Sequence, residues 1–273
     1  MSEFNLLQNL HNKKKESSVT FVKDPFPILV IKDPLSKGTY QILSDHYPKP
    51  KTCFQEDLKN HQIMLSNTYY SLNADSLLDH SKVNTVWKKF VEYQTSNQFF
   101  QDLLKFLGKE IQELHPGLEN EIGKPLQKWS SGVRWKTSRT DLALDCQVGF
   151  NSPVIQKSQI LGPHLDDKSQ LYTGLFYMRK DDDDSKGGIL EFYSHPDGKF
   201  ILEDHPLWGK NTIRDARLKR ILSIPYQENC LILFINSKKS LHAISEIEST
   251  LHMRRIVTLS GRILNHPRKG LWD

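Results

Sequence analysis

The chain has 273 residues and a formal net charge of +5 at pH 7, and 25% of its residues are charged. A chain of this length can bury one large core, and its mild positive charge lacks the dense basic tracts that favour a nucleic-acid partner. Three scattered cysteines, Cys53, Cys146 and Cys230, exclude a disulfide framework and fit a reducing compartment. The N-terminus lacks the apolar run of a signal peptide and no stretch approaches membrane-spanning length, so we expect a cytoplasmic protein without a membrane partner.

The N-terminal part predicts a lead-in followed by a strand and a helix. Residues 1–23 are polar and rich in lysine, which predicts a flexible lead-in to one domain over residues 24–273. The apolar, β-branched run 26–31 predicts a strand, and Ser36 is placed to cap the helix that follows.

Residues 84–115 show helical periodicity. Apolar side chains recur three and four positions apart on both sides of Ser96, and Pro116 ends the pattern. Because an apolar stripe of this kind has to be buried, the segment predicts helices that pack on the core.

The second half of the chain alternates apolar, strand-like runs with polar turns. Strands are predicted over residues 142–150, 173–178, 230–235 and 254–259. The segment 193–225 is longer than a simple hairpin needs, and long connections on a rigid scaffold often carry binding function. Substrate selection is therefore expected there.

His164 and Asp166 are the first candidate metal ligands. In an extended backbone, residues two apart point to the same side, so both donors reach one ion. His242 follows the apolar run 230–235 and supplies a third donor. Two histidines and a carboxylate with open positions are typical of a non-haem Fe(II) oxygenase.

The other histidines are weaker candidates for the third ligand. His252 is a rival third ligand, but it lies two positions before Arg254, so we prefer His242. His195, His205 and His266 have loop-like, polar neighbours, which favours solvated side chains.

The order of these motifs resembles the Fe(II)- and 2-oxoglutarate-dependent dioxygenases, and within them the prolyl 4-hydroxylase-like branch. The match covers residues 140 to 264 and consists of His-x-Asp, a strand ending in Tyr, Gly-Gly, a distal His and Arg-x-x-x-Thr. The motif residues are His164, Asp166, Tyr177, Gly187, Gly188, His242, Arg254 and Thr258.

The resemblance implies a fold, cofactors and residue roles. The fold would be mainly β with packed helices, with helical support over 84–115 and a double-stranded β-helix, or jelly-roll, core over about 130–265. His164, Asp166 and His242 would bind Fe(II), and the reaction would consume O2 and 2-oxoglutarate. Arg254 would grip the distal carboxylate of 2-oxoglutarate, with Tyr177 and Thr258 as hydrogen-bonding neighbours and Gln147 as a further contact to co-substrate or substrate.

Physical chemistry supports the role of Arg254. A dicarboxylate in a dry pocket needs a cation with fixed donor geometry, which arginine provides bidentately and lysine does not. Strand alternation should turn the neighbouring Arg255 to the opposite face.

The resemblance implies hydroxylation of an unactivated C–H bond coupled to decarboxylation of 2-oxoglutarate to succinate and CO2. Asp166 favours hydroxylation, because halogenating relatives lack this carboxylate. The substrate would be a small molecule or a peptide, most closely a prolyl peptide. A nucleic-acid demethylase is an alternative, although Ile256 and Ser260 replace the Asn and Arg of its usual motif. A non-enzymatic jelly-roll binding module is a second alternative, in which broken ligand positions are expected.

Overall fold

The structure is a computed structural model. It describes residues 2–11, 18–50, 66–200, 203–204, 211–213, 215–264, 266 and 270–272. The α-helices are α1 (Lys37–Asp45), α4 (Ala74–Asp79), α5 (Thr85–Gln94), α6 (Asn97–Leu114) and α7 (Leu118–Ile122), and the 3-10 helices are η1 (Gln8–His11) and η3 (Leu126–Lys128). The strands before the long 193–225 connection are β1 (Val19–Val22), β2 (Ile28–Lys32), β3 (Tyr69–Leu72), β4 (Ser131–Val133), β5 (Leu142–Asn151), β6 (Gln170–Tyr177) and β7 (Leu190–Ser194). Those within or after it are β8 (Glu203–Asp204), β9 (Asn211–Thr212), β10 (Lys219–Ile224), β11 (Cys230–Ile235), β12 (His242–Ile244) and β13 (Arg254–Ile263).

Two sheets form the centre of the molecule. The major sheet has eight strands in the order β1-β2-β11-β6-β13-β5-β3, with β4 paired to β5, and the minor sheet has the order β10-β7-β12. From β6 onward the chain crosses repeatedly between them: β6 joins the major sheet, β7 and β10 the minor one, β11 the major, β12 the minor and β13 the major. Between β5 and β6 the chain forms isolated bridges with the segment around β12, at Val154, Ser158 and His164. This antiparallel wiring is that of a double-stranded β-helix, so the predicted mainly β fold with packed helices is confirmed.

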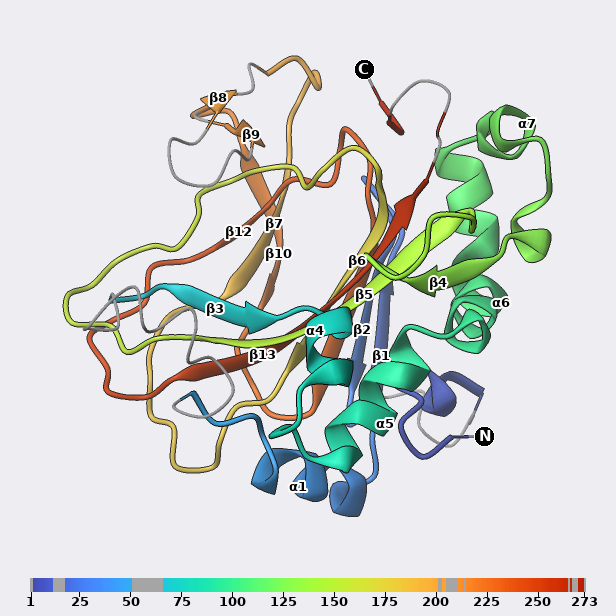
Figure 1. Ribbon diagram of the computed structural model, residues 1–273. Coiled ribbons are helices and arrows are strands. Elements are labelled where there is room, and N and C mark those ends of the chain that lie inside the picture. The colour runs from blue at the N-terminus through green and yellow to red at the C-terminus, as the bar shows by residue number, and fades with distance from the viewer. Residues whose placement is uncertain are drawn as a thin grey trace.

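The two faces of the major sheet bury different cores. Figure 1 shows α4, α5 and α6 on one side of this sheet and the minor-sheet strands β7, β10 and β12 on the other. Alternation along each strand divides the side chains between these faces. On β6, Phe176 belongs to the core under the helices, whereas Leu175 and Tyr177 belong to the core between the sheets.

The helices form where the sequence predicts them. Ser36 caps α1 by accepting a hydrogen bond from the amide of Thr39, and Ser96 caps α6 in the same way through Phe99. Phe99, Phe100, Leu103, Leu107 and Ile111 of α6 are buried. None of the helices in the described ranges is long and apolar enough to span a membrane.

The described parts of the N-terminal segment differ from the expected flexible lead-in. Leu6 and Leu7 are fully buried in the core under the helices. Asn5 donates a hydrogen bond to Asp102 of α6, at 3.1 Å. Residues 19–22 form β1 at the edge of the major sheet. Asn5 and Asp102 lie 97 positions apart, and a local lysine-rich composition does not reveal such a contact.

Candidate metal centre

His164, Asp166 and His242 converge on one point between the two sheets. Each is buried, and one potential ligand atom from each lies within 4.8 Å of the others. His164 and His242 are direct cross-strand neighbours, because the amide of each donates to the carbonyl of the other, at 3.0 and 3.2 Å. Directly opposed residues of antiparallel strands point to the same face, so this bridge brings together two ligands 78 positions apart in the sequence.

Backbone carbonyls fix the orientation of both imidazole rings. Nδ1 of His164 donates to the carbonyl of Gly162 at 2.9 Å, and Nδ1 of His242 donates to that of Ser240 at 3.0 Å. A carbonyl oxygen can only accept, so the proton resides on Nδ1 and the lone pair on Nε2. Nε2 of His242 lies 3.9 Å from Oδ2 of Asp166. Both rings therefore present the nitrogen that a metal ion requires.

A polar network behind Asp166 holds its carboxylate. Thr173 donates to Oδ2 of Asp166 at 2.5 Å, and the amide of Gln170 lies 3.4 Å from the same oxygen. Asn236 in turn donates to the hydroxyl of Thr173 at 3.0 Å. Sequence reasoning missed these supporting residues, although alternation along β6 already places Thr173 on the same face as Tyr177.

Arg254 lies on the same inner face, at the start of β13. It is buried, Nη1 donates to the carbonyl of Gly188, and Nη2 has no hydrogen-bond partner among the described residues. The guanidinium carbon lies 4.9 Å from the ring centre of Tyr177 and 4.2 Å from that of Tyr226. The hydroxyl of Tyr177 is also buried and without a partner in the described part of the chain. Burial raises the pKa of Tyr177 and the charge of Arg254 opposes this rise, so the phenol is neutral at pH 7.

The other two predicted pocket residues share this face. Thr258 pairs with Gln147 across β13 and β5, and its hydroxyl lies 3.4 Å from that of Tyr69 on β3. Burial raises the pKa of Tyr69 to about 12. Gln147 donates to Asn73 and Asp145, at 2.9 and 3.1 Å. Tyr226 was not predicted as a pocket residue from the sequence.

Arg255 points away from this pocket, as strand alternation predicts. Its guanidinium donates to the carbonyl of Ser44 at 3.1 Å and lies 4.7 Å from the ring centre of Tyr47. Both partners belong to the helical side of the major sheet. The two neighbouring arginines thus have separate surroundings.

The remaining histidines lie apart from the triad. His252 precedes β13 and pairs with Asp184 at 3.3 Å. His195 and His266 are not solvated as expected: the first lies between Asp197 and Asp215, each at 2.8 Å, and the second lies 3.3 Å from Glu121. Asp215 and Glu121 come from distant parts of the chain, and Asp197 lies in the same turn as His195. A polar local sequence does not show whether a histidine contacts such a carboxylate or water. His205 lies outside the described residues.

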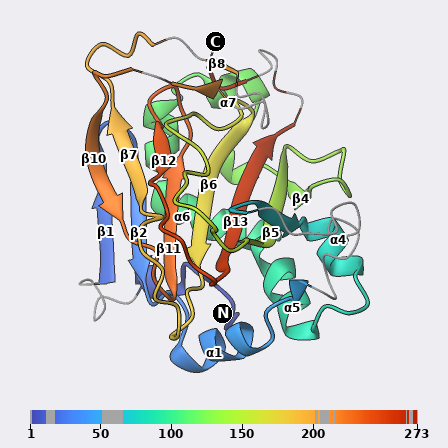
Figure 2. The same ribbon diagram turned by 90° about the vertical axis from the view of Figure 1, so that its left-hand side faces the viewer.

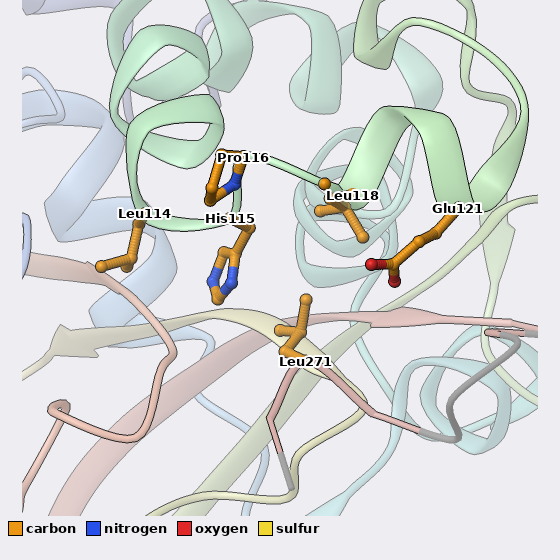
Figure 3. Close-up of a pocket in the computed structure, with 7 residues that line it drawn as sticks. Leu114, His115, Pro116, Leu118, Glu121 and Leu271 are labelled. Atoms are coloured by element: carbon orange, nitrogen blue, oxygen red, sulfur yellow. The ribbon is translucent and has the colours of Figure 1, made fainter.

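Glu121 also lines a pocket in the helical layer. Figure 3 shows this pocket between the end of α6, α7 and the C-terminal segment. Its side chains include Leu114, His115, Leu118 and Leu271, and none of them belongs to the triad or to the surroundings of Arg254. The two sites are nevertheless connected, because Nε2 of His115 lies 2.8 Å from the carbonyl oxygen of Asn236, whose side-chain amide donates to Thr173.

The residues of the inner face fit Fe(II) and 2-oxoglutarate. Two imidazole nitrogens and one carboxylate form the donor set of non-haem Fe(II) oxygenases. Unpaired buried donors are rare in proteins, and Arg254 Nη2 and the Tyr177 hydroxyl are two of them on adjacent strands. A carboxylate placed between them would satisfy both.

Comparisons with known proteins give matches among solved structures alone. No protein-family model matches the chain, and no curated protein matches it. A prolyl-4-hydroxylase from Pseudomonas putida is 12% identical, with a TM-score of 0.44 over 96% of this chain and 99% of that one. A prolyl 4-hydroxylase from Phytophthora capsici is 12% identical, with a TM-score of 0.47 over 98% and 69% of the two chains. A Trichoplax adhaerens prolyl hydroxylase, solved with a peptide fragment of hypoxia inducible factor, is 11% identical, with a TM-score of 0.35 over 98% and 90%.

Proposed function

We propose that the protein is an Fe(II)- and 2-oxoglutarate-dependent oxygenase that hydroxylates an unactivated C–H bond. One observation carries the proposal. A buried His-Asp-His triad shares the inner face of the jelly roll with a buried arginine, Arg254, that has an unpaired nitrogen. The triad supplies the metal ligands, and Arg254 supplies the cation that a dicarboxylate co-substrate requires.

The ligand roles follow from the hydrogen bonds. His164 and His242 would bind the ion through Nε2, since their Nδ1 atoms donate to carbonyls. Asp166 would bind through its carboxylate, which Thr173 orients. When bound, iron would supply the oxygen chemistry: one atom of O2 would enter succinate as 2-oxoglutarate loses CO2, and the other would hydroxylate the substrate.

The protein's own groups would orient the co-substrate and keep it dry. Arg254 would pair with the distal carboxylate through Nη2, and the neutral Tyr177 would donate its hydroxyl proton to the same group. Phe192 and Phe234 are buried and meet edge to face at 5.3 Å, and their ring centres lie 6.2 and 4.8 Å from that of His242, so apolar rings flank this ligand. In such an environment the charge pair is stronger than in water.

The substrate is proposed to be a small molecule or a peptide, with a prolyl peptide as the first class to test. Succinate release from 2-oxoglutarate and Fe(II) should be measured across peptides, free amino acids and other small molecules. Stimulation by one class would identify the substrate, and product mass would show the added oxygen. Absence of both stimulated and unstimulated 2-oxoglutarate turnover would refute the proposal.

Ligand variants connect that turnover to the triad. His164→Ala and His242→Ala should each abolish turnover and weaken Fe(II) binding, because each removes one of three protein donors. His252→Ala is the matched control, since His252 contacts Asp184 instead of the triad. If His252→Ala lost activity while His242→Ala kept it, the ligand assignment would be wrong.

A further inference from the structure

Two arginines outside the proposed chemistry lie on the inner side of the major sheet, beside the metal centre. Arg134 follows β4, and its amide donates to the carbonyl of Leu144 on β5 at 2.8 Å. Arg262 lies on β13, opposite Gln170 of β6. Gln170 contacts the metal-ligating Asp166, so Arg262 adjoins the network that supports the triad.

Arg134 uses little of its hydrogen-bonding capacity. Among the described residues its guanidinium donates one hydrogen bond, from Nη1 to Asp145 at 3.4 Å. Asp145 is buried and already accepts from the amide of Ala74 at 3.0 Å and from Gln147 at 3.1 Å. A guanidinium has five N–H donors, so most of those of Arg134 remain available to another acceptor.

Arg262 is also only partly satisfied. Its Nη1 contacts Asp167 at 2.8 Å and Ser169 at 3.1 Å, while its Nε is buried with no partner in the described part of the chain. Burial lowers the pKa of Arg134, and the positive charge of Arg262 lowers it further. The two arginines flank β5, because the amide of Arg134 bonds to Leu144 on one side and Arg262 lies opposite Ala143 on the other. At the usual strand spacing their backbones are about 10 Å apart, so an anion over β5 is within reach of both long side chains and would engage their unused donors.

Trp135 covers Arg134 from the solvent side. The guanidinium carbon of Arg134 lies 4.5 Å from the centre of the indole ring, and Trp135 is 66% exposed. Its backbone is left-handed, with φ of 69°, in a turn closed by Lys136 N–H and the carbonyl of Val133 at 3.1 Å. This position favours glycine or asparagine, and the contact that offsets the strain of Trp135 is the one with the Arg134 guanidinium. Such outliers concentrate at functional sites.

We propose that Arg134 and Arg262, covered by Trp135, bind a carboxylate group of the substrate. The assignment of this ligand as the substrate rests on the proposed function. In Figure 2 the minor-sheet strands β7, β10 and β12 lie over one half of the major sheet, and β13, β5 and β4 lie toward the other. Strand β5 is two strands from β6, about 10 Å at the usual strand spacing. A carboxylate held there would place a C–H bond several atoms away near the triad.

Asp145 and Asp167 do not already serve as this ligand. Together they neutralise the charges of the two arginines, but each contacts a single nitrogen of its partner. A bidentate carboxylate needs two parallel N–H donors, which Arg134 retains. The chemistry fits a free amino acid or other small carboxylic acid, and equally an acidic side chain or C-terminus of a peptide.

Binding can be tested without metal or turnover. Metal-free protein is titrated with free amino acids, N-acetyl amino acids and acidic peptides, each compared with its amide, while acrylamide quenching of tryptophan fluorescence is recorded. The Trp135 part of that signal is the difference from Trp135→Phe. Carboxylates should reduce the quenching of Trp135 by acrylamide, and the amides should not. Comparison of the free acids with the peptides shows whether the bound carboxylate belongs to a small molecule or to a peptide. Trp135→Phe checks the reporter, because it should remove the signal.

Variants of Arg134 test the contact itself. Arg134→Gln should weaken carboxylate binding about tenfold to 100-fold, the range for losing a charged hydrogen bond. Arg134→Lys keeps the positive charge but lacks the two parallel N–H donors of arginine, so it should give an intermediate loss of carboxylate affinity. An intermediate loss would also show that the loss in Arg134→Gln is not caused by misfolding. Lys136→Gln is the control, because Lys136 pairs with Asp79 at 2.7 Å and should leave binding unchanged.

The outcomes separate this inference from the proposed function. Carboxylate binding that depends on Arg134 in a protein without 2-oxoglutarate turnover would support an anion site and refute the oxygenase. Turnover stimulated equally by acids and amides, with KM unchanged in Arg134→Gln, would refute the carboxylate site and leave the oxygenase standing. Lack of protection by every carboxylate tested would also refute the site.

Discussion

Gly188 and Arg254 fit together so closely that any side chain at position 188 would collide with the arginine. The carbonyl of Gly188 accepts from Nη1 of Arg254, and a Cβ on Gly188 would overlap that same nitrogen. The backbone of Gly188 is also left-handed, with φ of 64°. The Gly-Gly motif therefore leaves the space that the guanidinium of Arg254, the candidate group for binding 2-oxoglutarate, occupies.

Replacement of Gly188 should disturb 2-oxoglutarate binding. Gly188→Ala should raise the KM for 2-oxoglutarate about tenfold to 100-fold, because the methyl group displaces Arg254. Gly198→Ala is a matched control, since Gly198 has the same φ of 64° and nothing within 4 Å of the added Cβ. Steady-state kinetics with 2-oxoglutarate as the varied substrate measure both. Equal KM values for the two variants would show that the Arg254 contact does not matter.

Substitution of Arg254 should affect co-substrate binding, whereas substitution of its neighbour Arg255 should affect stability. Removing one member of a buried charge pair costs about 3 to 5 kcal/mol, so Arg254→Ala should raise the 2-oxoglutarate requirement by about two decades or more. Fe(II) affinity measured without co-substrate should remain nearly unchanged. Arg255→Ala should instead lower the free energy of unfolding by about 1 to 3 kcal/mol, because it loses the Ser44 carbonyl and the Tyr47 ring. A raised 2-oxoglutarate requirement in Arg255→Ala alone would contradict this assignment.

Thr173 should set the metal affinity through Asp166. Thr173→Val keeps the shape of the side chain and removes the donor at 2.5 Å from Asp166. Loss of a residue that orients a metal ligand usually weakens metal binding about tenfold to 100-fold. Anaerobic Fe(II) titration measures the effect, and Thr20→Val, at an exposed position on β1, is the control. Unchanged affinity in Thr173→Val would mean that Asp166 does not depend on this hydroxyl.

Tyr69 should make stability fall at alkaline pH. Its pKa is about 12 in the folded protein, chiefly because of burial, against about 10 in an unfolded chain. The neutral phenol is therefore favoured by folding, and its contribution is complete below about pH 10 and lost as the pH rises toward 12. The difference in unfolding free energy between wild type and Tyr69→Phe should be flat below about pH 10 and then shift against the wild type. A constant difference up to pH 12 would contradict the raised pKa.

The sequence by itself determined the features that depend on short-range periodicity. The 3.6-residue period over 84–115 predicted α5 and α6, and the alternation of a strand turned Arg254 and Arg255 to opposite faces. The order of the motifs identified the three residues that converge as the triad. In each case the information lies within a few positions along the chain or in a motif that the sequence displays directly.

Only the tertiary structure decided what depends on the register between distant strands. The support of Asp166 by Asn236 through Thr173, the match of Gly188 to Arg254, and the burial of Leu6 and Leu7 all join segments far apart in the sequence. A shift of one residue in a strand pairing would turn every one of its side chains to the other face, and local composition does not set that register. Packing of the whole core selects it, which is why the ligands could be predicted and the residues that hold them could not.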